Sequence, residues 1–337
     1  MENSLYAMLR NKYQIGNHYI SAYLSNLFGT DHVDIEIFNQ KLTNPNLATW
    51  ADYALSTNRR GRAFAEILRP HLPKDARRYL DVGSAYGGFL IGFMELGLDV
   101  IGIELSENLV HLSRANFKDY GREDSTIKGD ILDENLLSQL GKFDVITCID
   151  MIEHVSDVPR AMKNMVQLLN PGGILVLQMP NKDSLSNVMA DSHFNIFGLT
   201  LLKHPDARRF YFCNFPSSNM YDVGEYYQQE YYLRLLADLG CGPLVLPPAV
   251  PTSLTEKARL IPKFYSRLGR FLFRNAVTVP FDLKLKISLR ALFYITSFLI
   301  GLGIVTLFSK ARKRTLKQKF ADDAWFIIGT KITGNMR

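Results

Sequence analysis

A glycine-rich turn between an apolar run and an amphipathic stretch constrains the fold of this chain more than any other feature. It lies in residues 78–90, RYLDVGSAYGGFL, where Gly83 and Gly87 permit a close backbone approach and a positive φ. A strand–turn–helix joint of this kind leaves backbone N–H groups and a helix N-terminus at the carboxyl edge of a sheet. The pattern therefore predicts a site for a nucleotide-like ligand.

Two acidic residues narrow the type of ligand. Asp81 precedes the first glycine by two positions, where its carboxylate can face a cationic amine. Glu104 ends the next β-prone run, about 20 residues further on, the spacing at which an acidic side chain binds ribose hydroxyls. Two alternatives stay open at this point. One is a tight turn without a ligand, and the other is a degenerate dinucleotide fingerprint, Gly83-x-Ala85-x-x-Gly88.

The rest of this region alternates between strand and helix, as a parallel α/β sheet requires. We expect strands at 78–83, 99–105, 126–130, 143–149 and 173–179, and helices near 87–96, 106–119, 133–140 and 157–169. Ser106 and Asp157 are candidate N-caps. Asp130, after the third strand, could accept a hydrogen bond from an adenine amino group beside Ile131, or it could cap the following helix.

The fourth strand ends in polar residues that could carry chemistry. Asp150 is expected at the carboxyl edge of the sheet, where ligands of open α/β sheets bind. His154 follows on a short turn, and a neutral imidazole there could accept a proton from a hydroxyl nucleophile. A purely structural histidine is the alternative. A helix is expected from Trp50 to Leu68, and its Asn58, Arg59 and Arg60 could contact a carboxylate of the ligand or form a solvated face.

The charge is unevenly distributed. Residues 257–319 contain 15 lysines and arginines and a single acidic residue, Asp282, whereas the remainder of the chain is net acidic. An anionic surface is therefore the expected partner of this segment alone. Three cysteines form no metal-binding or disulfide pattern, and the first residues do not predict a signal peptide. We expect a cytoplasmic protein.

An ordered series of motifs resembles the class I S-adenosylmethionine-dependent methyltransferases. The series is LDVGSAYGG, VIGIELS, KGDI, FDVITCIDMIEHV and LLNPGGILVLQMPN, it covers roughly residues 50–182, and it is most similar to the ubiquinone-pathway O-methyltransferases. The resemblance implies S-adenosylmethionine as cofactor. It places Asp81, Gly83, Ser84 and Gly87 at the methionine end, Glu104 and Leu105 at the ribose, Asp130 and Ile131 at the adenine, and Asp150 toward the methyl group and acceptor.

The sequence departs from the family pattern at two positions. Ala85 stands where the family usually has glycine, from which we expect a tighter turn. Asp150 replaces the first glutamate of an acidic-plus-histidine cluster that in quinone-pathway relatives is linked to a divalent cation, so we expect no metal site here. No motif for base methylation of DNA is present, and no nucleic-acid partner is expected.

The resemblance also predicts the architecture. We expect a Rossmann-like, seven-stranded, mostly parallel sheet with helices on both faces and the last strand inserted beside the fifth. The predicted divisions are a helical extension (1–49), the cofactor-binding core (50–182), a lid with acceptor-side elements (183–248), a basic hydrophobic insertion (249–320) and the final strand (321–337). The lid is dense in aromatic residues, and His193, Tyr211, Tyr221 and Tyr226 could line the acceptor pocket or simply pack against the body.

The insertion suggests contact with a membrane. Residues 291–308 carry no charge over 18 positions, the lower limit for a membrane span, and residues 261–281 suit a helix in the interface. Because both ends would belong to one soluble domain, we expect a monotopic hairpin at the inner membrane face. A buried helical hairpin or dimer interface is the alternative.

Together these features predict a methyltransferase acting on a hydroxyl of an apolar or lipid-linked small molecule, with Asp150 and His154 as catalytic residues. Three alternatives remain: an acceptor that is a sugar or soluble metabolite, a non-catalytic membrane-bound scaffold on the same fold, and an NAD-dependent oxidoreductase. Asp81 and the lack of an evident second catalytic domain argue against the last of these.

Overall fold

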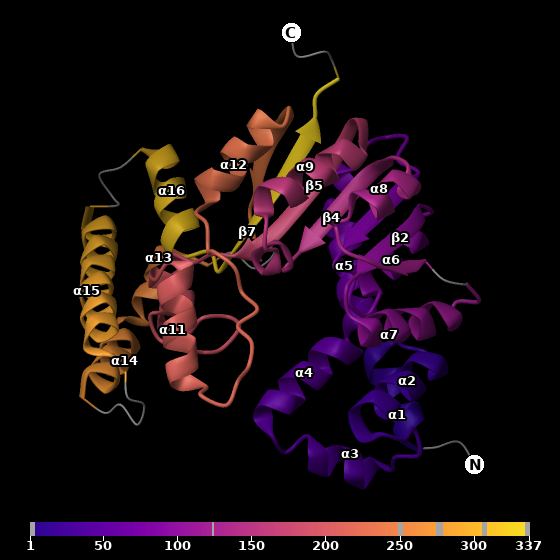
Figure 1. The fold of residues 1–337 in the computed structure, drawn as a ribbon, viewed down its shortest axis with the longest axis horizontal. Coiled ribbons are helices and arrows are strands. Elements are labelled where there is room, and N and C mark those ends of the chain that lie inside the picture. The colour runs from indigo at the N-terminus through magenta and orange to yellow at the C-terminus, as the bar shows by residue number, and fades with distance from the viewer. Residues whose placement is uncertain (1–3, 123–124, 249–251, 274–278, 305–308, 334–337) are drawn as a thin grey trace.

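The core of the protein is a seven-stranded sheet in the order β3-β2-β1-β4-β5-β7-β6 (Figure 1). The computed structural model describes residues 4–122, 125–248, 252–273, 279–304 and 309–333. Strands β1 to β5 run parallel, and β7 pairs antiparallel with both β5 and β6. The strands are β1 (Arg78–Val82), β2 (Asp99–Glu104), β3 (Thr126–Lys128), β4 (Phe143–Ile149), β5 (Leu169–Pro180), β6 (Cys241–Leu246) and β7 (Ala324–Lys331). The predicted topology, including the last strand beside the fifth, is confirmed.

Helices cover both faces of the sheet, as predicted. One face is covered by α5 (Thr57–Leu68), α6 (Gly88–Glu95) and α7 (Glu107–Lys118), which share a buried apolar cluster with it. The other is covered by α8 (Glu134–Leu140), α9 (Val158–Leu168) and α12 (Gln229–Asp238). The Asp157 side chain caps α9 by accepting from Arg160 N, whereas Ser106 precedes α7 without such a bond.

The N-terminal helices form a separate small layer beside α7, with a hydrophobic cluster of their own. They are α1 (Ser4–Tyr13), α2 (Asn17–Phe28), α3 (Ile35–Lys41) and α4 (Pro45–Leu55). Asn44 caps α4, and the chain turns at Ser56 before α5 begins. The division expected at 49/50 therefore falls inside α4, and the helix expected from Trp50 to Leu68 is two helices.

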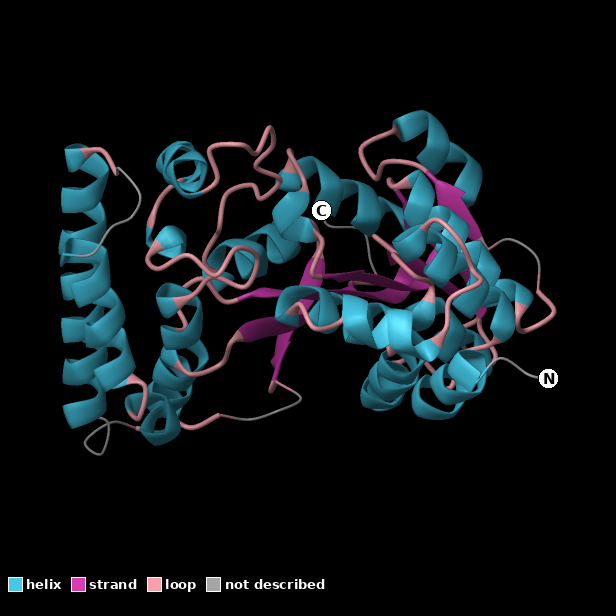
Figure 2. Cartoon of the chain, turned by 90° about the horizontal axis from the view of Figure 1, so that it is seen from below, coloured by secondary structure: helices cyan, strands magenta, loops and turns pink. Residues whose placement is uncertain are grey.

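The lid and the insertion share one hydrophobic cluster at the end of the molecule away from β2 (Figure 1) and from the N-terminus (Figure 2). The cluster joins residues of the lid, such as Leu199 and Phe210, to residues of the insertion, such as Phe264 and Ile295. Its helices are α10 (Leu185–Met189), η3 (Leu199–Leu201), α11 (His204–Asn214), α13 (Leu254–Ala258), α14 (Ile261–Phe273), α15 (Phe281–Ile304) and α16 (Lys310–Phe320). The two predicted divisions are thus packed as one unit. Two further short helices are η1 (Arg69–His71) and η2 (Ile152–His154).

Helix α15 lies at the outer edge of this unit (Figure 2). It starts ten positions before the uncharged run and continues to Ile304, and residues 305–308 of that run lie outside the described part of the chain. One face is buried, at Leu283, Ile287, Ala291, Tyr294, Ile295 and Phe298. The opposite face exposes Leu289, Phe293 and Ile300. Among the described helices, α15 alone is long and apolar enough to cross a membrane, and one third of that stretch is buried within the protein.

Candidate active site

The glycine-rich turn joins β1 to α6 through left-handed backbone. Gly83 has φ 81° and Gly87 has φ 76°. A Cβ atom on Gly83 would lie 2.5 Å from Cγ of Met151. This contact and the positive φ each exclude a side chain at the position. Gly83 N and Ser84 N both donate to Ile103 O, which fixes the turn against β2. The positive φ that the sequence predicted at both glycines is confirmed.

Ala85 also adopts a left-handed conformation, with φ 45°. An L-residue pays about 1–2 kcal/mol for this conformation, while glycine adds flexibility to the unfolded chain. We therefore expect Ala85→Gly to leave the free energy of unfolding unchanged or to raise it by up to about 1 kcal/mol. Ala63→Gly, in the exposed interior of α5, should lower it by about 1 kcal/mol. Urea unfolding of both variants tests this, and a comparable loss in Ala85→Gly would contradict it.

Asp81 lies beneath the turn and is 1% exposed. Its Oδ1 accepts from Thr147 Oγ1 at 2.6 Å, while Oδ2 is buried and has no hydrogen-bond partner among the residues that the structure describes. The pKa of Asp81 is raised to about 7, mainly by burial; the hydrogen bond from Thr147 opposes the rise, and the charge of Glu104 adds to it. A buried carboxylate with a free oxygen is suited to a cationic group, which is what the ammonium of S-adenosylmethionine supplies.

Glu104 connects β2 to the turn. Its Oε2 accepts from Ala85 N and its Oε1 from Ser106 N, each at 2.9 Å. Each carboxylate oxygen retains a second lone pair, so ribose hydroxyls can still donate to it. The residue is 8% exposed. Its position therefore fits the ribose role that the sequence predicted.

A cavity of about 620 Å³ opens above these elements at the carboxyl edge of the sheet. Its lining includes Gly83, Ser84, Glu104, Leu105, Asp130, Ile131, Asp150 and His154, whereas Asp81 and Gly87 lie under the turn and do not line it. Asp130 Oδ1 accepts from Leu132 N, and Asp133 rather than Asp130 caps α8. The structure thus brings eight of the predicted cofactor and catalytic residues to the cavity wall, and it places Asp81 and Gly87 beneath the turn.

Asp150 stands at the end of β4 in a left-handed conformation, with φ 50°. Strained non-glycine backbone of this kind is concentrated at functional sites. Its Oδ2 accepts from Gln178 Nε2 at 3.1 Å, which holds the carboxylate at the cavity wall. Gln178 had no role in the sequence-based prediction.

His154 lies on η2 with a defined neighbour at one ring nitrogen. Its Nδ1 is 2.9 Å from the carbonyl oxygen of Asp222. A carbonyl oxygen can only accept, so Nδ1 carries the proton and, in the neutral ring, Nε2 has the free lone pair. Asp222 and Met220 are the lid residues that line the cavity.

The residue before His154 in the chain, Glu153, is a buried acid. Glu153 is 2% exposed, and both of its carboxylate oxygens lack a partner within the described chain. Burial, with the charge of Asp150, raises its pKa to about 8. His193 Nε2 lies 3.7 Å from Glu153 Oε1, and burial lowers the pKa of His193 to about 4. Glu153, His154 and His193 offer donor atoms within 4.8 Å of one another and are the residues that could hold a cation.

The four aromatic or histidine residues expected to line the acceptor pocket lie outside the lining of the large cavity. Tyr211 and Tyr221 pack into the aromatic cluster around Phe194. His193 Nδ1 is 2.9 Å from the hydroxyl of Tyr226. The alternative of packing against the body therefore describes Tyr211 and Tyr221 better.

Helix α5 supplies a part of the site that the sequence did not resolve. Gly61 approaches α6 so closely that a Cβ atom there would lie 1.8 Å from Gly88 O. This contact brings Arg60 to the cavity wall, whereas Asn58 is buried against Asn116 and Arg59 is exposed. The Arg60 guanidinium lies 3.6 Å from the Tyr53 ring centroid and donates from Nη2 to Tyr53 O at 3.0 Å, and its buried Nε has no hydrogen-bond partner in the described part of the chain.

Arg60 is therefore expected to bind the carboxylate of the cofactor. Arg60→Ala should weaken S-adenosylmethionine binding about tenfold, since a charge-assisted hydrogen bond contributes roughly 1.5–3 kcal/mol, part of which solvent screens. Arg59→Ala, on the same helix but exposed, is the control and should leave the affinity unchanged. Calorimetric titration measures both, and equal affinities in the two variants would exclude this role for Arg60.

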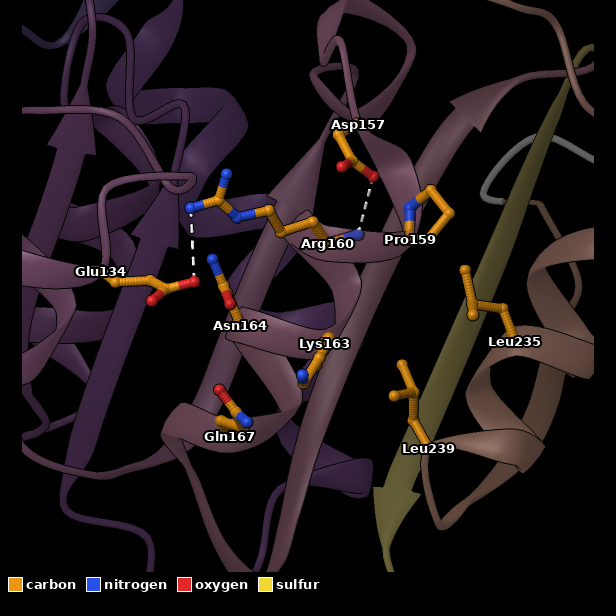
Figure 3. Close-up of a pocket in the computed structure, with 9 residues that line it drawn as sticks. All are labelled: Glu134, Asp157, Pro159, Arg160, Lys163, Asn164, Gln167, Leu235 and Leu239. Carbon is orange, nitrogen blue, oxygen red and sulfur yellow. Dashed lines mark hydrogen bonds and ion pairs between the residues drawn. The ribbon is translucent and has the colours of Figure 1, made fainter.

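A second groove, of about 550 Å³, lies between α8, α9 and α12 on one face of the sheet (Figure 3). Its Arg160 side chain is held by Glu134 at 3.3 Å and by Leu132 O at 2.9 Å. The groove contains none of the predicted site residues. It is therefore separate from the cofactor cavity.

Comparison with known proteins agrees with this geometry. A family model described as "Methyltransferase domain" matches residues 54–243, more than half of the chain. The ubiquinone biosynthesis O-methyltransferase of Methylococcus capsulatus is 28% identical over 127 residues, which are 37% of this chain and 52% of that protein. That of Psychrobacter cryohalolentis is 33% identical over 121 residues, covering 34% and 45%. The chain thus spans about half the length of the curated relatives it matches.

Among solved structures, a SAM-dependent methyltransferase from Archaeoglobus fulgidus aligns with a TM-score of 0.44 and 17% identity, covering 80% of this chain and 94% of that one. The family match spans the turn, the acidic residues and the cavity described above. The chain belongs to the methyltransferase domain family, and S-adenosylmethionine is its cofactor.

Proposed function

We propose that this protein transfers a methyl group from S-adenosylmethionine to a hydroxyl of an apolar or lipid-linked small molecule. The observation that carries the proposal is the single cavity that joins the Glu104 and Arg60 side chains to Asp150 and His154. Such a cavity can hold a cationic cofactor and an acceptor at the same sheet edge.

Most residues of the site bind the cofactor, and one removes a proton from the acceptor. The cofactor supplies a methyl group already activated on a sulfonium, so the protein acts mainly by alignment. The methionine end of the cofactor is bound by Asp81, Gly83, Ser84 and Gly87. The ribose is bound by Glu104 and Leu105, and the adenine by Asp130 and Ile131. The Asp150 carboxylate forms the part of the cavity wall against which the acceptor would bind.

His154 is the proposed general base. The Asp222 carbonyl orients its ring so that Nε2 can accept the hydroxyl proton as the new O–C bond forms. His154→Gln should lower turnover while leaving the cofactor affinity unchanged. A parallel loss of both would instead indicate a structural role.

The outer face of α15 supports the apolar or lipid-linked class of acceptor. Phe293 is 77% exposed and Leu289 is 59% exposed, which is unusual for side chains in water. The helices before and after it in the chain, α14 and α16, carry basic residues of the segment 257–319. Apolar and basic side chains together suit an anionic membrane surface. We therefore propose a cytoplasmic protein associated with the inner membrane face.

The packing of α15 favours a helix that lies flat over one that dips into the bilayer, because its inner face is buried against the protein. Deletion of 257–319 would expose that cluster, so point variants are the better test. Leu289→Gln with Phe293→Gln should reduce binding to vesicles containing phosphatidylserine. Ile37→Gln, an exposed apolar residue on α3, is the matched control.

Methyl transfer itself is tested with purified protein, methyl-labelled S-adenosylmethionine and a membrane extract. We expect the label to enter the organic phase. Label confined to the aqueous phase would instead favour a sugar or a soluble metabolite as acceptor. Cofactor binding without any labelled product would favour the non-catalytic scaffold.

A further inference from the structure

We propose that Tyr53 of α4 and Met220 of the lid bind the apolar part of the methyl acceptor and so determine which acceptors are methylated; this inference rests on the function proposed above. Both side chains line the same cavity as His154, the proposed general base. Neither is among the residues expected to bind the cofactor. An acceptor bound by them would lie in the cofactor cavity itself, and its hydroxyl would share that cavity with the base.

Met220 belongs to the lid segment that orients His154. Asp222 O accepts from His154 Nδ1 at 2.9 Å, and Gly224 N donates to Glu153 O at 2.6 Å. These two bonds fix the lid to η2 directly after Met220. The Met220 side chain is 64% exposed and also lines the cavity, so it lies at the open mouth. It is therefore placed to contact an acceptor whose hydroxyl faces the base.

Tyr53 reaches the cavity from α4 in the N-terminal layer, whereas the lid belongs to the unit that contains α11 and α15 (Figure 1). The Arg60 guanidinium lies over the Tyr53 ring. Burial raises the pKa of Asp150, and the hydrogen bond from Gln178 opposes this rise. The charges of Arg60 and His154 also oppose it, so both groups lie near the Asp150 carboxylate. Tyr53 is thus linked through Arg60 to the part of the cavity where the acceptor would bind.

The two side chains indicate a flat apolar group. Tyr53 is 39% exposed, and Arg60 covers one face of its ring. The rings of Trp50 and Tyr86 are inclined to it at 77° and 66°, so neither is stacked on it. A tyrosine ring can stack on a flat group, and the flexible thioether of methionine makes favourable contacts with aromatic rings. A sugar would instead place hydroxyls against Tyr53 and Met220 and leave them unpaired. We therefore expect a fused aromatic ring with one hydroxyl.

The experiment measures binding of 2-naphthol to the full chain saturated with S-adenosylhomocysteine. Met220→Gln removes an apolar contact from an exposed position, so the fold is preserved. It should weaken 2-naphthol binding at least about fivefold, with cofactor affinity unchanged. Asn219→Gln is the control, because Asn219 is the exposed neighbour of Met220 and lies outside the lining. It should bind 2-naphthol as the wild type does.

Tyr53 is tested by a pair of variants. Tyr53→Phe keeps the ring and should bind 2-naphthol as the wild type does, whereas Tyr53→Leu should weaken binding about tenfold. Tyr53→Leu also removes the ring beneath Arg60, which is why S-adenosylhomocysteine is kept at a saturating concentration for each variant. Trp50→Leu is the control, since Trp50 is an exposed aromatic residue of the same helix outside the lining. It should leave 2-naphthol binding unchanged.

Methyl glucoside provides the competing arm. The inference would be overturned by binding of methyl glucoside in preference to 2-naphthol, by failure of the wild type to bind 2-naphthol, or by wild-type affinity in Met220→Gln or Tyr53→Leu. A loss in either control as large as in its matched variant would overturn it as well. Failure of the proposed function looks different, because the wild-type protein would then bind the cofactor and label no product from membrane extract. A labelled product whose formation is unaffected by Met220→Gln and Tyr53→Leu would overturn the role of these two residues alone.

Discussion

Cofactor affinity is expected to fall roughly 100-fold when Asp81 is replaced by asparagine, because a charge-assisted hydrogen bond to a buried carboxylate contributes about 1.5–3 kcal/mol. The substitution keeps the size of the side chain and its bond from Thr147. It removes the charge that would face the ammonium of the cofactor. Calorimetric titration with S-adenosylmethionine measures the effect.

The same substitution should stabilise the protein in the absence of cofactor. The pKa of Asp81 is raised in the folded state to about 7, so the fold binds this proton more tightly than the unfolded chain does. Stability from this group is therefore fully present at low pH and is lost as the pH rises from about 4 through about 7. At pH 8, Asp81→Asn should raise the free energy of unfolding by up to about 4 kcal/mol, and it should flatten the pH dependence.

Asp99→Asn is the matched control, since the Asp99 side chain is exposed at the opposite end of β2 from Glu104 and forms an ion pair with Arg78 across 3.5 Å. It should change neither cofactor affinity nor the pH profile of stability. A loss of stability in Asp81→Asn at pH 8, or an unchanged cofactor affinity, would show that the buried carboxylate serves the fold instead of the ligand.

The second large effect is expected at Gly61. Its added Cβ would lie 1.8 Å from the Gly88 carbonyl oxygen, which is backbone and cannot turn away. Gly61→Ala should therefore lower the free energy of unfolding by roughly 2–4 kcal/mol, although alanine has the better helix propensity. Because α5 must then move from α6, Arg60 should leave the cavity and cofactor affinity should fall as well.

Gly269→Ala, in α14, is the same substitution at a helical position with open space around the added Cβ. It should stabilise by up to about 1 kcal/mol through helix propensity. If the close approach of α5 and α6 determines the loss of stability, chemical unfolding should show a lower free energy of unfolding for Gly61→Ala and a higher one for Gly269→Ala. An increase in the free energy of unfolding for both variants would show that α5 can move away from α6 without loss of stability.

Local patterns determined the core and the general class of its ligand. Strand and helix alternation predicted a parallel α/β sheet, and the glycine turn at 83–87 with the spacing of Asp81 and Glu104 predicted a nucleotide-like ligand. The seven-stranded topology and the choice of S-adenosylmethionine followed from the resemblance of the ordered motif series to a known family. The N-cap at Asp157 was predictable for the same reason. Helix boundaries were less so, since the break at Ser56 leaves the apolar spacing of α4 and α5 intact.

Only the tertiary structure decided which side chains join this local framework. Arg60 and Gln178 come from separate elements: the sequence left open which of residues 58–60 would contact the ligand, and it assigned no role to Gln178. The tertiary structure also divided α15 into a buried and an exposed face, a distinction that its uncharged part after Arg290 does not encode by itself. Backbone conformation depends on neighbours along the chain, whereas cavities and faces depend on the packing of distant segments, and this is why the first was predictable and the second was not.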